Sequence, residues 1–315
     1  MPLPHVPVLL PAVLAHLRAA ALPAGYFVDA TVGAGGHAAA VLSAAPQAHL
    51  LGLDRDPRAL ELAAERLSPF GERATLRHAS YTQLGEIVPA WLALLGADAS
   101  GVDGILLDLG LSSMQLDDPA RGFAFRHEGP LDMRFDPAAP LTAEEIVNTW
   151  SAEEIADVLF RYGEERHSRR IARAIVAARP LTNTRQLAEV VAGAVRGPRQ
   201  KIHPATRTFQ ALRIAVNDEL GALERTLPVA IDLLRPGGRL AVISFHSLED
   251  RIVKRVFRRE ATDCLCPPKQ PVCTCGHVAR VRLVTRKPIR ATEQEIRANP
   301  RSRSARLRVV ERLGV

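Results

Sequence analysis

Short apolar runs separated by glycine-rich or polar turns predict five β-strands. They span residues 26–30, 48–54, 74–80, 103–110 and 239–245. The segments that follow the first two runs, HAAAVLSAA and DPRALELAAERL, carry apolar residues at helical spacing, and Asp56 and Pro57 form a favourable helix start in the second. A strand, a turn, a helix and a further strand in this order predict an α/β domain with a parallel sheet.

The alternation of strands and helices stops after Gly110. Between about Asp117 and Asp218 the segments AEEIVNTW, AEEIADVLFRYG, RRIARAIVAAR and TRQLAEVVAGAV have helical periodicity, and strand-like sequence returns only near Arg239. We therefore predict an all-helical domain over residues 116–218, inserted into a discontinuous α/β domain formed by residues 1–115 and 219–315.

Composition places the chain among ordinary globular proteins. Of its 315 residues, 47% are hydrophobic and 24% are charged, which excludes a disordered or collagen-like chain. No apolar run reaches the length of a membrane span, and the N-terminal apolar stretch is interrupted by Pro7, Pro11 and His16. The four cysteines lie close together instead of forming a spread disulfide framework. We expect a cytoplasmic protein without membrane contact.

Charge is distributed unevenly. The net charge is +7, but residues 251–315 hold 17 basic and 5 acidic side chains, whereas residues 108–165 hold 13 acidic and 4 basic ones. The basic segment favours a surface that faces nucleic acid, with an ordinary solvated surface as the alternative.

A glycine-rich loop follows the first predicted strand. Gly33, Gly35 and Gly36 let the backbone approach a ligand closely, and the helix after them presents its N-terminus there. Asp54 ends the second strand, where a carboxylate can accept hydrogen bonds from ribose hydroxyls. The pattern predicts a nucleoside cofactor. Its last two positions are His37 and Ala38, so it lacks the final glycine of G-x-G-x-x-G. Asp29 before the loop suits a cationic ligand, yet both NAD and S-adenosylmethionine remain open on these grounds.

Two further positions lie at the carboxyl ends of predicted strands. Asp108 ends the fourth strand, and the long polar loop after it contains Ser112 and Gln115. His246 follows the fifth strand and is expected to face the same crevice as Asp108. A capping or turn role is the alternative for Asp108, and a structural role is the alternative for His246.

An RNA-contacting segment is predicted ahead of an amphipathic helix near residue 205. His203, Arg207 and Phe209 lie together there, and Arg can hold a phosphate while Phe can stack on an unstacked base. The alternative is that Phe209 packs in a helical core.

Taken together, these motifs resemble the ribosomal RNA small subunit methyltransferase H (RsmH/MraW) family. The resemblance runs in order from His5 to Val309 and is carried by HVPVLL, DATVGAGGH, LDRDP, DGILLDLGLSSMQLDDPARGF, GPLDMR, YGEER, RIARAIV, HPATRTFQALRI, PGGRLAVISFHSLEDRIVKR and NPRSRSARLRV. It implies a class I S-adenosylmethionine-dependent, Rossmann-like fold with an inserted helical domain. It also implies N4-methylation of a cytosine in the decoding (P-site) region of 16S rRNA within the 30S subunit.

The resemblance also implies a set of cofactor contacts. Its cofactor-binding positions correspond here to Gly35, Gly36, His37, Asp54, Tyr81, Asp108 and Gln115.

The chemistry of the implied reaction narrows the catalytic residues. The N4 lone pair of cytosine is delocalised, so positioning of the methyl group and a polar acceptor near N4 are the enzyme's main tasks. Many N4-cytosine methyltransferases carry a Ser- or Asp-Pro-Pro-aromatic motif after the fourth strand, but this chain has Asp108-Leu-Gly-Leu. Asp108, Ser112 and His246 are the candidate acceptors. The candidate RNA contacts are His203, Arg207, Phe209, Arg301, Arg303 and Arg306.

The cysteines form two C-x-C pairs, Cys264 with Cys266 and Cys273 with Cys275. Reduced surface thiols are expected, and a tetrahedral zinc site is the alternative. A NAD-dependent oxidoreductase and a non-catalytic RNA-binding protein are the alternative functions. The first predicts Gly at position 38, and the second leaves the glycine loop without a role. No obligate protein partner is expected, and the chain is predicted to be a monomer or homodimer.

Overall fold

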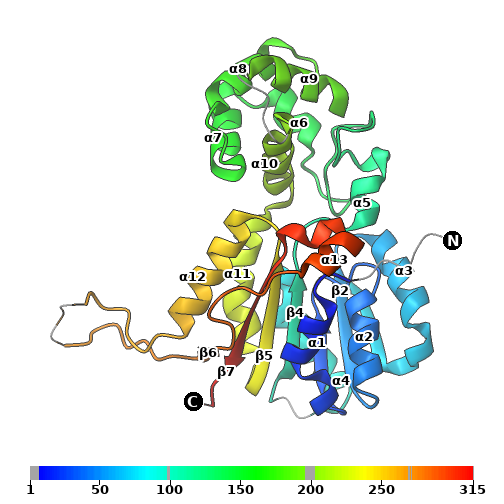
Figure 1. Ribbon diagram of the computed structural model, residues 1–315, viewed down its shortest axis with the longest axis vertical. Coiled ribbons are helices and arrows are strands. Elements are labelled where there is room, and N and C mark those ends of the chain that lie inside the picture. The colour runs from blue at the N-terminus through cyan, green and yellow to red at the C-terminus, as the bar shows by residue number, and fades with distance from the viewer. Residues whose placement is uncertain (1–6, 98–99, 196–202, 269, 271, 315) are drawn as a thin grey trace. The chain divides into compact units, whose positions relative to one another are not determined.

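The computed structural model describes residues 7–97, 100–195, 203–268, 270 and 272–314, and the chain divides into two compact units (Figure 1). The first unit combines Met1–Gly110 with Leu220–Val315, and the second is Leu111–Glu219. Residues 111–115 and Glu219 thus lie with the helical unit, whereas the sequence-based boundaries placed them in the α/β domain.

A seven-stranded sheet forms the centre of the first unit, in the order β3-β2-β1-β4-β5-β7-β6. The strands β1 to β5 run parallel, and β7 is antiparallel to both β5 and β6. Their bounds are β1 Tyr26–Asp29, β2 His49–Asp54, β3 Ala74–His78, β4 Val102–Asp108, β5 Leu234–Ser244, β6 Val281–Leu283 and β7 Arg306–Arg312. The five predicted strands are confirmed, while β6 and β7 were not predicted.

Alternate residues of each strand face opposite layers of helices, because side chains of a strand alternate between the two faces of a sheet. On β1, for example, Phe27 packs in one apolar cluster with Val41, while Val28 packs in another with Val88. Burial on both faces explains why β1, β2 and β4 appear in the sequence as continuous apolar runs.

The helices of the first unit connect these strands. Their bounds are α1 Leu10–Leu17, α2 Gly36–Ala44, α3 Pro57–Leu67, α4 Leu84–Leu94, α11 Glu219–Asp232, α12 Ser247–Glu260 and α13 Glu293–Ala298, with 3₁₀ turns at Ala19–Ala21, Ser68–Arg73, Tyr81–Gln83 and Pro300–Ser304. The predicted start of α3 is confirmed, since the Asp56 side chain accepts a hydrogen bond from Arg58 N and Pro57 is the first helical residue.

The second unit has helices around its own apolar core. Their bounds are α5 Ser113–Asp117, α6 Ala143–Thr149, α7 Ala152–Gly163, α8 Ser168–Ala177, α9 Thr184–Ala194 and α10 Ala205–Asn217, with a 3₁₀ turn at Pro119–Arg121. Thr142, Ser151 and Asn183 cap α6, α7 and α9 by accepting a hydrogen bond from the backbone three residues ahead. Helices α6 to α9 match the four predicted helical segments and α10 matches the predicted amphipathic helix, whereas α5 lies where a long polar loop was predicted. No helix within the described residues is long and apolar enough to cross a membrane.

Candidate active site

Three aspartates end three adjacent strands of the first unit. Asp29 ends β1, Asp54 ends β2 and Asp108 ends β4, and β1 lies between the other two strands. Asp29 is paired with Gly52 on one side and with Leu106 on the other, so Asp54 and Asp108 each lie two residues beyond its level. Ligands of open α/β sheets bind at this edge, which makes the aspartate group the candidate site.

Asp54 holds the glycine loop in place. Its Oδ2 accepts a hydrogen bond from Gly33 N at 2.8 Å, and its Oδ1 accepts one from Asp56 N at 2.9 Å. Gly33 has a φ of +52°, a conformation that glycine adopts without strain. Burial raises the pKa of Asp54 above its usual value, although these backbone donors act in the opposite direction.

The next two glycines are required by packing within the unit itself. Gly35 has a φ of +77° and precedes α2, and a Cβ on it would lie 3.3 Å from Ala63 Cα of α3. A Cβ on Gly36 would lie 2.5 Å from Pro7 Cγ. Gly35 and Gly36 thus have a structural reason to be glycine besides the predicted cofactor contact.

Asp29 and Asp108 are linked through Thr31. Thr31 N donates to Asp29 Oδ1 at 3.3 Å, and the Thr31 hydroxyl oxygen accepts from Asp108 N at 2.6 Å. Asp29 is 3% exposed, and burial raises its pKa to about 7, with a smaller contribution from the negative charge of Asp54. The sequence predicts that Asp29 suits a cationic ligand, whereas no sequence motif singles out Thr31.

Asp108 has the most strongly perturbed carboxyl of the three. Burial raises its pKa well above the usual value, and the charges of Asp29 and Glu249 add to the effect. Its Oδ1 is buried and has no hydrogen-bond partner among the described residues, while its Oδ2 lies 3.7 Å from His37 Nδ1. A buried acceptor without a partner is costly, so this atom marks the place where a ligand group would gain most.

His37 is buried in the first turn of α2. Its Nε2 lies 2.9 Å from the carbonyl oxygen of Val8, and its Nδ1 faces Asp108. The predicted residues Gly35, Gly36, His37, Asp54 and Asp108 are therefore brought together in one unit.

His246 caps helix α12. Its Nδ1 accepts a hydrogen bond from Glu249 N at 3.4 Å, and Glu249 Oε2 accepts from Phe245 N at 2.8 Å and from His246 N at 3.2 Å. His246 follows β5, the neighbour of β4, as predicted. Its ring is held by the helix that it caps, which is the structural role given above as the alternative for this residue.

Tyr81 belongs to the same unit. It begins the 3₁₀ turn after β3, is partly buried and packs against the core that α4 covers. The side chain of Ser80 caps this turn, which fixes the backbone at Tyr81.

Ser112 and Gln115 lie in the second unit. The Ser112 hydroxyl accepts from Gln115 N at 3.2 Å, and Gln115 Oε1 accepts from Ser112 N at 3.1 Å, so the two form a capping box for α5. Their predicted roles at the cofactor and at N4 stay predictions.

The predicted RNA contacts of the second unit surround the start of α10, within a motif whose first two residues, 201 and 202, lie outside the described part. The Phe209 ring is 5% exposed and packs edge-on against Phe125 at 5.0 Å between ring centroids. The ring of His203 lies 4.7 Å from that of Phe125. Phe209 therefore forms part of the helical core and does not present its ring for stacking, contrary to the prediction. Arg207 is partly exposed, with its Nη1 4.0 Å from Glu165 Oε2.

The basic C-terminal segment is partly neutralised inside the first unit. Arg306 Nη1 lies 3.0 Å from Asp250 Oδ2, and the buried Arg308 binds both oxygens of the same carboxylate at 2.7 and 3.2 Å. Arg301 and Arg303 are exposed in the 3₁₀ turn before β7. Of the three predicted RNA contacts here, Arg306 is engaged in an ion pair and the other two lie on the surface.

Comparison with known proteins finds similarity along nearly the whole chain. A model of the MraW methylase family matches residues 2–313. Ribosomal RNA small subunit methyltransferase H of Symbiobacterium thermophilum is 52% identical over 98% of this chain and 96% of its own length, and that of Thermomicrobium roseum is 53% identical over 98% and 94%. A solved rRNA methylase structure from Streptococcus thermophilus, 11% identical, covers 96% of this chain and 97% of its own with a TM-score of 0.42.

Proposed function

This chain belongs to the MraW methylase family, and we propose on that premise that it transfers a methyl group from S-adenosyl-L-methionine to N4 of a cytosine in the decoding region of 16S rRNA. The substrate would be the RNA of the small ribosomal subunit, since relatives at 52% and 53% identity are named ribosomal RNA small subunit methyltransferase H. The observation that carries the proposal is the group of three aspartates on adjacent strand ends beside a glycine loop.

The aspartate group fits the cofactor chemically. S-adenosyl-L-methionine supplies an activated methyl group on a positively charged sulfur, and it also carries an ammonium group and two ribose hydroxyls. A carboxylate can accept about four hydrogen bonds. Asp54 takes one on each oxygen from Gly33 N and Asp56 N, so it keeps acceptor capacity for the ribose hydroxyls.

Asp29 and Asp108 would supply negative charge opposite the positively charged groups of the cofactor. Burial raises the pKa of both groups, which means that the folded protein alone does not stabilise their ionised forms. A cation held beside them would favour ionisation and gain attraction in return. Gly35, Gly36, His37, Tyr81 and Gln115 remain the further cofactor contacts that we propose.

Asp108 is the best supported of the three candidates for the acceptor facing N4. Its Oδ1 has no partner among the described residues, and burial raises its pKa, which makes the ionised carboxylate a stronger base than an exposed aspartate. The Ser112 hydroxyl and His246 Nδ1 each accept a backbone hydrogen bond at a helix start, and His246 Nε2 lies 3.2 Å from Glu249 Oε1. Asp108 would accept the proton that leaves N4, while the glycine loop and Asp54 orient the cofactor for in-line attack.

The RNA has to present one unstacked cytosine to this site. Arginines provide the attraction for its backbone, and we assign this role to the exposed Arg301 and Arg303 and to the partly exposed Arg207. Intact subunits would be better substrates than naked RNA, because structured RNA is recognised largely by shape.

The direct test uses methyl-labelled S-adenosyl-L-methionine and small subunits from a strain that lacks the enzyme. Label on N4 of one cytosine in 16S rRNA is the expected result, and the Asp108→Asn variant should transfer much less label at saturating cofactor. Label only on protein or DNA, or on a different position of the RNA, would refute the proposal.

A further inference from the structure

The cysteine segment between α12 and β6 is closed at its base but has no core of its own. Arg280 N donates to the carbonyl oxygen of Glu260 at 2.8 Å, and Ala279 N donates to Asp263 Oδ1 at 3.2 Å, so the two arms start and end together. Among the described residues of 261–280 none is buried. Apolar side chains of this segment are left in solvent, with Val272 70% exposed and Val278 54% exposed. Something other than apolar burial must therefore hold the two arms of this segment together.

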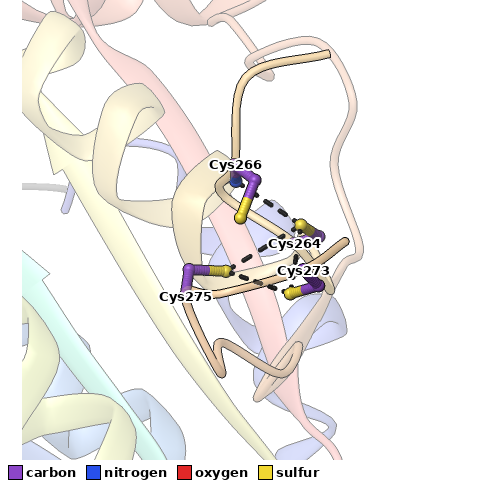
Figure 2. A group of neighbouring side chains, drawn as sticks. All are labelled: Cys264, Cys266, Cys273 and Cys275. Carbon is purple, nitrogen blue, oxygen red and sulfur yellow. Dashed lines mark hydrogen bonds between the residues drawn. The ribbon is translucent and has the colours of Figure 1, made fainter. Parts of the chain in front are cut away.

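Four sulfur atoms gather within this segment, two from each arm (Figure 2). The Sγ atoms of Cys264 and Cys273 are 3.5 Å apart, those of Cys273 and Cys275 are 3.6 Å apart, and those of Cys275 and Cys264 are 3.8 Å apart. The sulfur of Cys266 completes a group in which all four lie within 4.8 Å of one another. All four cysteines are free, so no disulfide accounts for the gathering.

These separations match a single tetrahedral ion. With zinc–sulfur bonds of about 2.3 Å, the edge of a regular tetrahedron of thiolates is about 3.8 Å. An iron–sulfur cluster would hold its thiolates further apart, because several irons and inorganic sulfurs lie between them. The distances within the group thus favour one soft divalent ion over a cluster.

Backbone donors support the thiolate form of the same sulfurs. Leu265 N lies 3.3 Å from Cys275 Sγ, Cys266 N lies 3.4 Å from Cys264 Sγ, and Thr274 N lies 3.4 Å from Cys266 Sγ. Such N–H groups neutralise part of the negative charge on metal-bound thiolates and orient them. They arise because each C-x-C pair turns its backbone toward the sulfurs of the group.

We propose that Cys264, Cys266, Cys273 and Cys275 form a structural zinc site that folds the segment between α12 and β6. Binding exchanges the thiol protons for one Zn²⁺ and releases them to solvent, leaving four thiolates on the ion. No coordination position stays open for water, so the ion acts as a cross-link and not as a Lewis acid. The site lies on a segment separate from the aspartate group, and its existence does not depend on the proposed methyl transfer.

The first experiment measures metal content. Protein prepared in reducing, zinc-supplemented medium and then desalted should carry about one zinc per chain by elemental analysis. The variants Cys264→Ser and Cys273→Ser should lose most of this zinc, and the matched control Val278→Ser, which changes the same segment away from the sulfurs, should keep it.

The second experiment identifies the ligands and the structural effect. Replacing zinc with Co²⁺ should give the strong visible absorption and the sulfur-to-cobalt charge-transfer band of a tetrahedral thiolate site, both absent in Cys273→Ser. Chelation should expose a protease cleavage site between Glu260 and Val281, and added Zn²⁺ should suppress the cleavage. Thermal unfolding of the cysteine variants should show that each protein is otherwise folded. A wild-type protein without bound zinc or a cobalt spectrum, or with disulfides among these cysteines under reducing conditions, would overturn the proposal.

Discussion

Replacing Asp54 by alanine tests the cofactor site most directly, because the structure gives this side chain two separable tasks. Its oxygens accept hydrogen bonds from Gly33 N and Asp56 N, and its remaining acceptor capacity is assigned to the cofactor. Hydrogen bonds to a charged group contribute about 1.5–3 kcal/mol each. Burial nevertheless raises the pKa of Asp54, so desolvation outweighs these bonds, and we expect Asp54→Ala to lower the free energy of unfolding by only about 1–2 kcal/mol.

Asp54→Ala should also lower the affinity for the cofactor, by more than the small loss of folding stability can account for. Losing the charged partner of buried hydroxyls costs about 1–3 kcal/mol, which corresponds to a roughly 5- to 150-fold higher Kd for S-adenosyl-L-methionine. Isothermal titration calorimetry on cofactor-free protein measures this Kd, and urea unfolding measures the stability.

Asp56→Ala is the matched control for this substitution. Asp56 is buried two residues away and caps α3 by accepting from Arg58 N at 3.1 Å, so its loss costs about 1 kcal/mol of stability without touching the proposed cofactor. Unchanged affinity in Asp54→Ala, or an equal loss in Asp56→Ala, would refute the assignment of Asp54 to the cofactor.

Three further outcomes follow from the described contacts. Burial raises the pKa of Asp29 from 3.8 to about 7, so between these pH values the folded protein binds more protons than the unfolded chain, and its stability should fall as the pH rises. Denaturant unfolding should show a shallower fall of stability with pH in Asp29→Asn, and equal slopes in the two proteins would contradict the reasoning. The double variant Arg301→Ala/Arg303→Ala should weaken subunit binding and lower the slope of log affinity against log salt concentration by up to about 2, with cofactor affinity unchanged. Filter binding across salt concentrations measures this slope, and an unchanged slope would exclude the two arginines as phosphate contacts. Arg306→Ala should in addition lower the Tm, because it breaks an ion pair with α12. Phe209→Ala should destabilise the helical unit by about 3–5 kcal/mol in thermal unfolding, and a stable variant that loses only RNA affinity would restore the stacking role.

The sequence predicted the parts of the fold that depend on local patterning. Strands buried on both faces appear as apolar runs, and capped amphipathic helices have recognisable starts. β7 escaped prediction because its Arg308 is buried, and its partner Asp250 is 58 residues away in sequence. Pairing over that distance leaves no local signal, so its arginines were interpreted as part of a nucleic-acid surface.

The site was predictable to the level of strand ends and no further. Parallel topology alone places Asp54 and Asp108 at one edge of the sheet. The hydrogen bonds that occupy Asp54 depend on where the loop folds back, and the capping role of His246 has no common sequence signature, since histidine is not among the preferred N-cap residues. The Ser112-x-x-Gln115 capping box, by contrast, was visible in the sequence and was overlooked.

The position of β7 between β5 and β6 has a consequence for synthesis of the protein. The helical unit is one continuous stretch, Leu111–Glu219, so it can fold on the ribosome while later residues are still being added. The sheet cannot be completed at that stage, because β6 pairs only with β7 among the described strands, and β7 spans Arg306–Arg312. A nascent chain therefore carries an unpaired edge on β5 until residues 306–312 have left the exit tunnel. A stalled or shortened chain that lacks these seven residues would expose that edge to pairing with other chains and would be a target for chaperones and proteases.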